Sequence, residues 1–246
     1  QNIFKLISYG IFFLLYGKIK GVSKNDVQIQ ETKLEKDISY KIFFVKNSRL
    51  YTDTINDTAF IKNNLIIDGP SFQLRNNKNA QTEENIVFQK GTPRLKKKIK
   101  GRVLSLLTGG GGNYNYWHWL FDVLPRIFIF SSHSDLNKVD YFLFPNLEEN
   151  FQKESIKILN LPFKKCLSSK YYRHFSANEV IATQHPYNFL NEPLEDSLNI
   201  PSWISSNLKE KFNLKGDNKK NNFPRKFYID RSDAKSDHAK MRTISN

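Results

Sequence analysis

The sequence contains one cysteine, Cys166, among its 246 residues. A single cysteine excludes an internal disulfide, so nothing in the sequence requires an oxidising compartment, and a cytoplasmic location is the simpler expectation. Hydrophobic residues make up 39% of the chain and aromatic residues 14%, which is enough to bury a core. We therefore expect a globular protein of one large or two modest domains.

Clustered metal ligands are also missing. The chain has no Asp-x-Asp, no His-x-x-x-His and no pair of cysteines. Proteins usually hold metals with such groupings of carboxylate, imidazole or thiolate ligands, so we expect no metal site. Four of the five histidines stand alone in the sequence and carry no predicted role: His133, His174, His185 and His238.

A transmembrane helix is not expected either. The apolar run in the N-terminal segment, residues 1–25, extends from Ile7 to Tyr16 and has lysines on both sides. This is about half the length of ~20 residues that a membrane span needs. Three interpretations remain: a helix lying in the interface of an anionic membrane, a helix packed on the domain, or a cleaved signal peptide.

Acidic residues are fewer than basic ones. The chain has 24 Asp and Glu and 38 Lys and Arg, which gives a formal net charge of +14. This charge favours anionic partners such as nucleic acid, acidic lipid or phosphorylated small molecules. A coding bias toward lysine, asparagine and isoleucine explains it equally well. The lysine run at residues 96–100 is either a solvated loop or a contact for phosphate or lipid. Nucleic acid is not an expected partner, since no nucleic-acid motif is present.

The apolar pattern divides the rest of the chain into three parts. Residues 26–100 carry short β-rich runs separated by turn residues, which predict an antiparallel meander between residues 38 and 74. Residues 101–215 alternate strand and helix patterns, which predict parallel βαβ units and an α/β fold. Residues 216–246 begin with a polar linker and continue as a strand and a basic tail.

Residues 102–126 predict a strand at 103–108, a four-glycine loop at 109–112, and a helix entered through Asn113 or Asn115. The loop fits neither the Gly-x-Gly-x-x-Gly nor the Gly-Lys-Ser/Thr phosphate pattern. It either holds an anion at the helix N-terminus or makes a tight turn. On a helical wheel the segment has two stripes, an apolar one of Trp117, Leu120, Phe121, Leu124 and Phe128 and a polar one of Asn115, His118, Asp122 and Arg126.

His118 and Asp122 are four residues apart, so their side chains are neighbours on a helix. A carboxylate beside an imidazole can orient it and raise its basicity, which makes the pair a candidate general base. Arg126, four residues beyond Asp122, offers an alternative, a structural ion pair with the same carboxylate. In the tail, Arg231 directly follows a predicted strand, and both Arg231 and Arg242 are either phosphate ligands or solvated charges.

Two motifs make the chain resemble glycosyltransferase family 61. The first family motif is close to Asn-Tyr-x-His-Trp-Leu-x-Asp-x-Leu-Pro-Arg, and it is matched here by Asn115, Tyr116, His118, Trp119, Leu120, Asp122, Leu124, Pro125 and Arg126. The second is a strand ending in Ser-Arg followed by Arg-x-Ile-x-Asn-Glu, matched by Arg231, Arg242, Ile244 and Asn246. The chain departs from it at Asp230, where serine is usual, and ends before the glutamate. The resemblance covers residues 101–246.

The resemblance implies a GT-B enzyme, in which two Rossmann-like domains face each other across a cleft. The first domain binds mainly the acceptor, and the second binds mainly the nucleotide sugar. Residues 101–215 are then the Rossmann-like acceptor-side domain, preceded by the β-rich region, and residues 216–246 are the linker and the start of an incomplete donor-binding domain. On this basis the chain alone is not expected to catalyse transfer.

The implied reaction is inverting, metal-independent and cofactor-free transfer from a nucleotide sugar to a hydroxyl of a glycan or glycolipid. In a bacterial context it would build a surface polysaccharide at the cytoplasmic face of the membrane, with residues 1–25 near anionic lipid. The implied roles are catalysis for Asp122 and His118, substrate binding for Asn115, Arg126, Gly111 and Gly112, and donor diphosphate binding for Arg231 and Arg242. The alternatives are a non-catalytic module that holds an anionic glycan or lipid and, on charge alone, a nucleic-acid binder.

Overall fold

The computed structural model describes residues 2–53, 57–71, 74–75, 78–79, 81–108, 114–187 and 193–212, all within one compact unit that spans residues 1–213. Four residues with expected roles lie outside the described residues, namely Gly111, Gly112, Arg231 and Arg242, as does the segment 216–246. Their roles therefore stay predictions.

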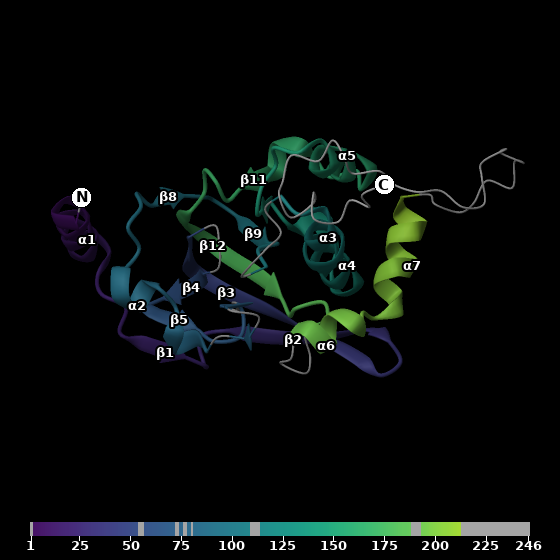
Figure 1. Ribbon diagram of the computed structural model, residues 1–246, viewed down its shortest axis with the longest axis horizontal. Coiled ribbons are helices and arrows are strands. Elements are labelled where there is room, and N and C mark those ends of the chain that lie inside the picture. The colour runs from purple at the N-terminus through teal and green to yellow at the C-terminus, as the bar shows by residue number, and fades with distance from the viewer. Residues whose placement is uncertain are drawn as a thin grey trace, which may run out of the picture. The chain divides into compact units, whose positions relative to one another are not determined.

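One mixed sheet of ten strands forms the centre of this unit (Figure 1). Its order is β1-β5-β4-β3-β12-β9-β10-β11, with β2 added to β3 and β8 added to β12. The strands are β1 (Gly21–Ser23), β2 (Gln28–Glu35), β3 (Ile38–Thr52), β4 (Thr58–Lys62), β5 (Leu65–Ile67), β8 (Lys97–Lys98), β9 (Arg102–Ser105), β10 (Tyr141–Phe144), β11 (Cys166–Ser168) and β12 (His174–Thr183). A separate antiparallel pair consists of β6 (Leu74–Arg75) and β7 (Lys78–Asn79).

Helices α4, α5 and α7 contribute apolar side chains to one shared core with the sheet. The helices and helical turns are α1 (Asn2–Tyr16), η1 (Thr82–Glu84), α2 (Val87–Lys90), α3 (Tyr116–His118), η2 (Trp119–Val123), α4 (Leu124–His133), η3 (Leu136–Lys138), α5 (Asn150–Ile158), η4 (Phe163–Lys165), α6 (Pro193–Leu198) and α7 (Ser202–Lys211). None of the helices in the described part of the chain has both the length and the apolar character needed to cross a membrane.

Strands β3, β4 and β5 form the predicted antiparallel meander. Two of the expected short strands are nevertheless one, because β3 runs unbroken for 15 residues. Asn47, with a φ of 49°, lies between these two expected strands, yet the chain does not reverse there. The reason is that β12 pairs with β3 from Tyr51 to Ile42 and supplies hydrogen-bond partners on both sides of Asn47.

The same pairing crosses the domain boundary expected at residue 100. Strand β3 belongs to the predicted β-rich region and β12 to the predicted acceptor-side domain, yet the two pair antiparallel along most of their length. Such a ladder puts their side chains into common cores. In the described residues, therefore, the regions 26–100 and 101–215 share one sheet and are not separated at residue 100.

Parallel βαβ units are also present, because β9 pairs parallel with β10 across α4, and β10 pairs parallel with β11 across α5. Four neighbouring strands of the sheet lie in the order β11-β10-β9-β12. Numbered by their order in the chain, this is 3-2-1-4. Doubly wound α/β sheets have this order at their centre, and they bind ligands beside the carboxyl ends of the strands where the order reverses. The α/β class is confirmed, whereas the two-domain GT-B arrangement stays a prediction.

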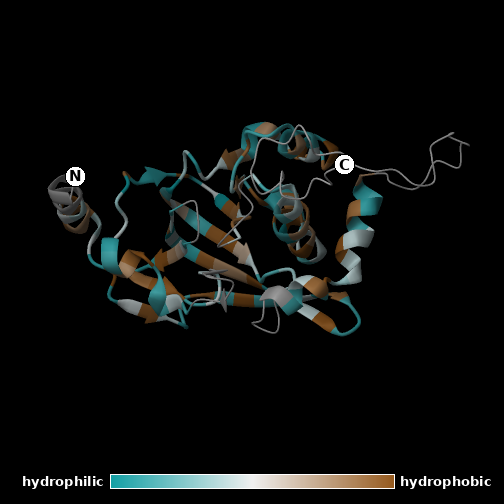
Figure 2. Cartoon of the chain, viewed as in Figure 1, coloured by the Kyte–Doolittle hydropathy of each residue, from teal (hydrophilic) through white to brown (hydrophobic). Residues whose placement is uncertain are grey.

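Successive side chains of the strands alternate between two cores, as the pleat requires. Leu104, Phe142 and Ile181 join the apolar cluster that includes α4 and α7. Val103 and Val180 join a second cluster on the opposite face. Figure 2 shows hydrophobic residues, in brown, along the central strands.

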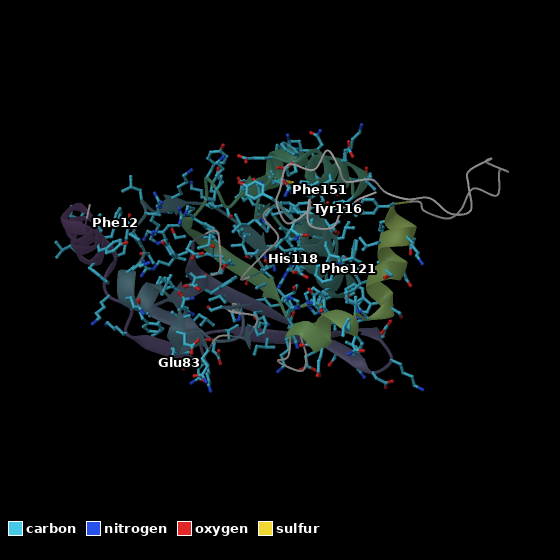
Figure 3. All side chains as sticks on the ribbon, in the orientation of Figure 1. Phe12, Glu83, Tyr116, His118, Phe121 and Phe151 are labelled. Carbon is cyan, nitrogen blue, oxygen red and sulfur yellow. The ribbon has the colours of Figure 1, made fainter. Side chains whose placement is uncertain are left out.

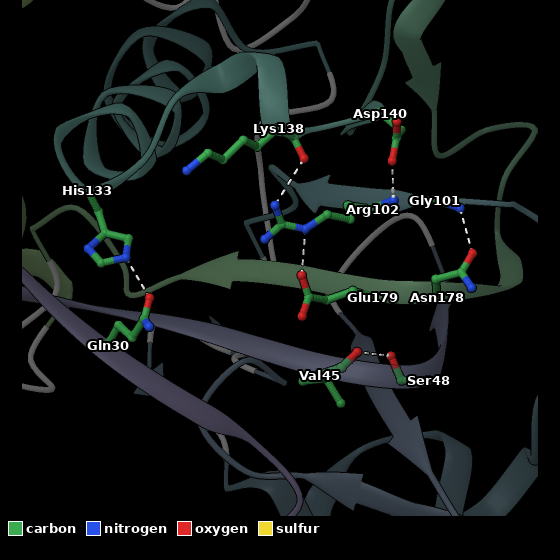
Figure 4. Close-up of polar contacts among 10 residues, drawn as sticks. All are labelled: Gln30, Val45, Ser48, Gly101, Arg102, His133, Lys138, Asp140, Asn178 and Glu179. Atoms are coloured by element: carbon green, nitrogen blue, oxygen red, sulfur yellow. Dashed lines mark hydrogen bonds and ion pairs between the residues drawn. The ribbon is translucent and has the colours of Figure 1, made fainter.

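Arg102 fixes the amino end of β9 to its neighbours (Figure 4). Its Nε donates to Glu179 Oε2 on β12 at 2.7 Å, and its Nη1 donates to the Lys138 carbonyl at 3.1 Å. Its backbone amide donates to Asp140 Oδ2 at 2.7 Å. The amino end of β9 is thus occupied by structural ion pairs and hydrogen bonds, and the polar groups with expected chemistry lie beyond its carboxyl end.

Candidate active site

The candidate site lies beyond the carboxyl ends of two neighbouring parallel strands, β9 and β12. After β9, which ends at Ser105, the chain continues into α3, η2 and α4; after β12, which ends at Thr183, it continues through residues 184–187. Side chains from both segments converge here. This is where the strand order reverses, the usual ligand position in a doubly wound sheet.

Asn115 begins the helical segment. Its Oδ1 accepts hydrogen bonds from the amides of Trp117 at 2.9 Å and His118 at 3.4 Å, as a helix N-cap does. Asn115 is one of the two entry points that the sequence predicts. Its side-chain oxygen is engaged with the backbone, so its expected contact with substrate stays a prediction.

A π-helical turn, η2, separates α3 from α4, and the buried residues of this segment differ from the predicted apolar stripe. Trp119, absent from that stripe, is fully buried, whereas Trp117, placed in it, is 37% exposed. A π turn closes hydrogen bonds five residues apart and so rotates the side chains relative to an ideal α-helix. Pro125 begins the next turn without an amide to donate to the carbonyl of Phe121, which favours this local change.

His118 and Asp122 lie side by side, as their four-residue spacing predicts. His118 Nδ1 lies 2.7 Å from Asp122 Oδ2. The Asp122 side chain is 2% exposed and that of His118 is 33% exposed, so the carboxylate lies behind the imidazole and the imidazole faces outward. The hydrogen bond to Asp122 raises the pKa of His118 against the opposing effect of burial. An imidazole held in this way has one nitrogen engaged and the other free to take a proton.

Arg126 does not form an ion pair with the Asp122 carboxylate, which was the alternative to the pair with His118. Its Nε donates to the Asp122 backbone carbonyl at 3.0 Å, and its Nη1 donates to the Thr183 carbonyl at 2.8 Å. It therefore ties the π turn to the end of β12. Burial lowers the pKa of Arg126 to about 10, which still leaves the guanidinium charged at neutral pH. Attraction to the nearby Asp122 carboxylate opposes this lowering of the Arg126 pKa.

Two residues of the site were not predicted, His185 and Tyr187, which follow β12. His185 carried no predicted role. Burial lowers its pKa to about 3, against the opposing effect of the Asp122 carboxylate and with a smaller lowering by the charges of Arg126 and His118, so it stays neutral. Burial and then the Asp122 carboxylate raise the pKa of Tyr187. The two rings meet edge to face, with centroids 4.6 Å apart. The position of both residues just after a strand, at its carboxyl end, was the signal that could have identified them.

The segment with His185 and Tyr187 is fixed by hydrogen bonds to β3. The Tyr40 hydroxyl donates to the Pro186 carbonyl at 2.7 Å and accepts from Trp203 Nε1 of α7 at 2.8 Å. The Gln184 amide donates to the Lys41 carbonyl at 2.8 Å. The β-rich region, which shares a sheet with the α/β region, thus positions the segment of the candidate site that carries His185 and Tyr187.

Aromatic side chains flank His118 on its exposed side. Tyr116 is 57% exposed and its ring meets Phe151 of α5 edge to face, with centroids 5.0 Å apart. Trp117 contacts His118 and Tyr187 edge to face, with centroid distances of 5.1 and 5.8 Å. Figure 3 shows Tyr116, His118 and Phe151 in this region. Exposed aromatic faces beside a polar dyad are suited to a ligand with both apolar and hydroxylated surfaces.

The part of the chain that the structure describes contains no group of three His, Cys, Asp or Glu side chains placed to hold a metal ion. Comparisons of the chain with protein-family models, curated proteins and solved structures found no match.

We expect the substitution Asp122→Asn to lower the pKa of His118, because the carboxylate is the main group that raises it. The raised pKa also means that the pair stabilises the fold fully below the unfolded pKa of about 6.5 and loses this contribution as pH rises through the folded pKa. An NMR titration of the His118 ring protons measures the pKa directly. Asp140→Asn, at the amino end of β9, is the control; equal His118 titrations in the two variants would contradict the pairing.

Proposed function

We propose that this chain is the acceptor-side part of a glycosyltransferase that moves a sugar from a nucleotide sugar to a hydroxyl of a glycan or glycolipid. The observation that carries the proposal is the hydrogen bond between His118 and the buried Asp122, beside the carboxyl ends of β9 and β12. The resemblance of residues 115–126 to a glycosyltransferase motif adds the reaction class. The proposed setting is the synthesis of a surface polysaccharide.

His118 is the general base and Asp122 orients it. The assignment follows exposure, because the His118 side chain reaches solvent and that of Asp122 does not. The acceptor O–H gives its proton to His118 Nε2 while its oxygen forms a bond to the anomeric carbon. The bond from that carbon to the diphosphate breaks, and the diphosphate leaves with the electron pair. Attack opposite to the leaving group inverts the anomeric centre, and ionised Asp122 stabilises the imidazolium.

The acceptor sugar stacks on the aromatic side chains beside His118. Tyr116 and Trp117 are both exposed and lie two residues and one residue, respectively, before the base. Their rings provide apolar faces for the carbon face of a pyranose, while its hydroxyls remain free to reach His118. Asn115 and Arg126 shape the site indirectly, by capping α3 and by joining the π turn to β12.

The donor half of the proposal concerns residues outside the described part of the chain. Arg231 and Arg242 would bind the diphosphate of the nucleotide sugar and stabilise its charge as it leaves, whereas the glycine loop at Gly111 and Gly112 would bind substrate on the acceptor side. The strand order β11-β10-β9-β12 supports a Rossmann-like acceptor side. The GT-B arrangement with a second such domain is part of the proposal.

We expect Arg231→Ala in the full-length protein to weaken nucleotide-sugar binding by about tenfold or more, because charge-assisted hydrogen bonds to phosphate are lost. Isothermal titration calorimetry with a panel of nucleotide sugars measures the affinity. Lys209→Ala, at an exposed cation on α7, is the control. Unchanged affinity in Arg231→Ala would contradict the donor assignment.

Release of nucleoside diphosphate in the presence of glycan acceptors tests the proposed activity. The expected result is release that depends on both the acceptor and His118. If a glycan binds but no nucleoside diphosphate is released with any of the donors, the site belongs to a non-catalytic glycan-binding module instead.

A further inference from the structure

Helix α1 packs on the domain with one face only. Tyr16 meets His174 edge to face, with ring centroids 4.8 Å apart, and its carbonyl accepts a hydrogen bond from Arg49 Nη2 at 3.2 Å. Phe13 lies over Gly91 so closely that a Cβ atom at Gly91 would be 3.0 Å from its ring. The helix is therefore anchored in a defined orientation beside α2 (Figure 1).

The opposite face of α1 is apolar and exposed. Ile11 is 51% exposed, Leu14 89% and Leu15 57%, and these positions fall on one side of the helix. Large side chains left in water along one helix face mark a surface that another phase or partner covers. The outer face of α1, defined by these three residues, has no covering element among the described residues.

Basic side chains lie next to the carboxyl end of α1. The loop from Arg94 to Lys98 is exposed throughout, and the Lys96 amide donates to the Tyr16 hydroxyl at 2.9 Å, which places this loop beside the end of α1. Leu95 is 76% exposed within the loop. Lys18 and Lys20, both exposed, follow directly after the helix. None of these basic residues forms an ion pair with a described residue.

A cavity of about 440 Å³ opens between α1 and this loop. Phe12 lines it from α1, Arg94 and Leu95 from the basic loop, and Tyr171 and Arg173 from the turn before β12. Its walls therefore combine guanidinium groups with apolar and aromatic side chains. This combination suits a phosphate-bearing lipid headgroup with its acyl chains alongside the apolar walls.

We propose that the outer face of α1 and the basic loop form a docking surface for an anionic lipid bilayer. Charge favours an anionic bilayer as the partner, since the chain has a net charge of +14. Lys18 and Lys20 and the lysines of the basic loop lie around the apolar residues of the outer face and not among them. At 15 residues, α1 is suited to lie in the interface. The site with His118 is carried by α3, away from α1 in Figure 1, so that docking leaves it open.

Flotation with lipid vesicles tests this surface. The protein is expected to bind phosphatidylglycerol vesicles, to bind phosphatidylcholine vesicles at least tenfold more weakly, and to be released by salt. Leu14→Glu is expected to lower the bound fraction about tenfold or more. Leu198→Glu is the matched control, because Leu198 is 80% exposed on α6. The double substitution Lys96→Glu and Lys98→Glu changes only exposed charges and is expected to weaken binding without unfolding the chain.

Circular dichroism of each variant separates loss of binding from loss of fold. Equal flotation with the two lipids, no flotation, or equal effects of Leu14→Glu and Leu198→Glu would overturn the proposal. A concentration-dependent dimer that Leu14→Glu abolishes would assign the surface to a second copy of the chain and would also overturn it.

Discussion

Replacing His118 by alanine is expected to lower the rate of sugar transfer at least ~100-fold, because general-base catalysis contributes about 10²–10⁴-fold. His118 is the polar side chain of the dyad that reaches solvent, and the buried Asp122 holds it by a 2.7 Å hydrogen bond. Nucleotide-sugar affinity should stay unchanged, since the proton transfer concerns the acceptor. Steady-state kinetics with donor and acceptor varied separately measure both quantities in the full-length protein.

Two controls distinguish a base from a structural histidine. His133→Ala removes a histidine at the end of α4 that contacts Gln30, and it should leave transfer unchanged. His118→Gly should regain part of its activity when imidazole is added, because the 33% exposed His118 side chain leaves a position that solvent can reach. Full activity in His118→Ala, or loss of donor binding with it, would contradict the assignment.

The largest expected loss of stability comes from Trp119→Ala. Trp119 is fully buried, stacks on Phe144 with ring centroids 5.4 Å apart, and donates from Nε1 to Ser155 Oγ at 3.2 Å. Removing such a ring leaves a cavity and takes one of two partners from Ser155 Oγ, which still donates to the Phe151 carbonyl, so the free energy of unfolding should fall by about 3–5 kcal/mol. Urea unfolding measured by circular dichroism gives the difference.

Trp117→Ala is the matched control for Trp119→Ala. Trp117 is 37% exposed and makes only ring contacts, so its removal should cost about 1 kcal/mol or less. An ideal α-helix through this segment predicts the reverse order, with Trp117 in the core. A larger loss for Trp117→Ala would therefore contradict the π turn between Trp119 and Val123.

The sequence was sufficient for elements whose signals are local. The β3-β4-β5 meander, the strands β9 and β10 and the start of α3 at Asn115 were all predictable from apolar runs and turn or cap residues. The length of β3 was not, because β12, more than a hundred residues later, supplies its partners across Asn47. A long-range ladder of this kind leaves no mark in a local pattern.

The candidate site was likewise predictable only where its signals are local. The proximity of His118 and Asp122 followed from their spacing, whereas the burial of Trp119 did not, because a wheel of constant pitch cannot contain a π turn. His185 and Tyr187 reach Asp122 through the adjacency of β9 and β12, which depends on strand order. Strand order also explains why the regions before and after residue 100 differ in their local pattern, β-rich and α/β, yet contribute strands to one sheet.

The pH dependence of transfer in the wild type and in Asp122→Asn tests the central proposal most directly. If His118 is the base and Asp122 raises its pKa, the wild-type kcat/KM rises with pH and levels off above an apparent pKa higher than 6.5. In Asp122→Asn the inflection should move to lower pH, and the plateau should fall because the imidazole is no longer oriented. The same inflection in both proteins would show that the group titrating in catalysis is not His118 paired with Asp122.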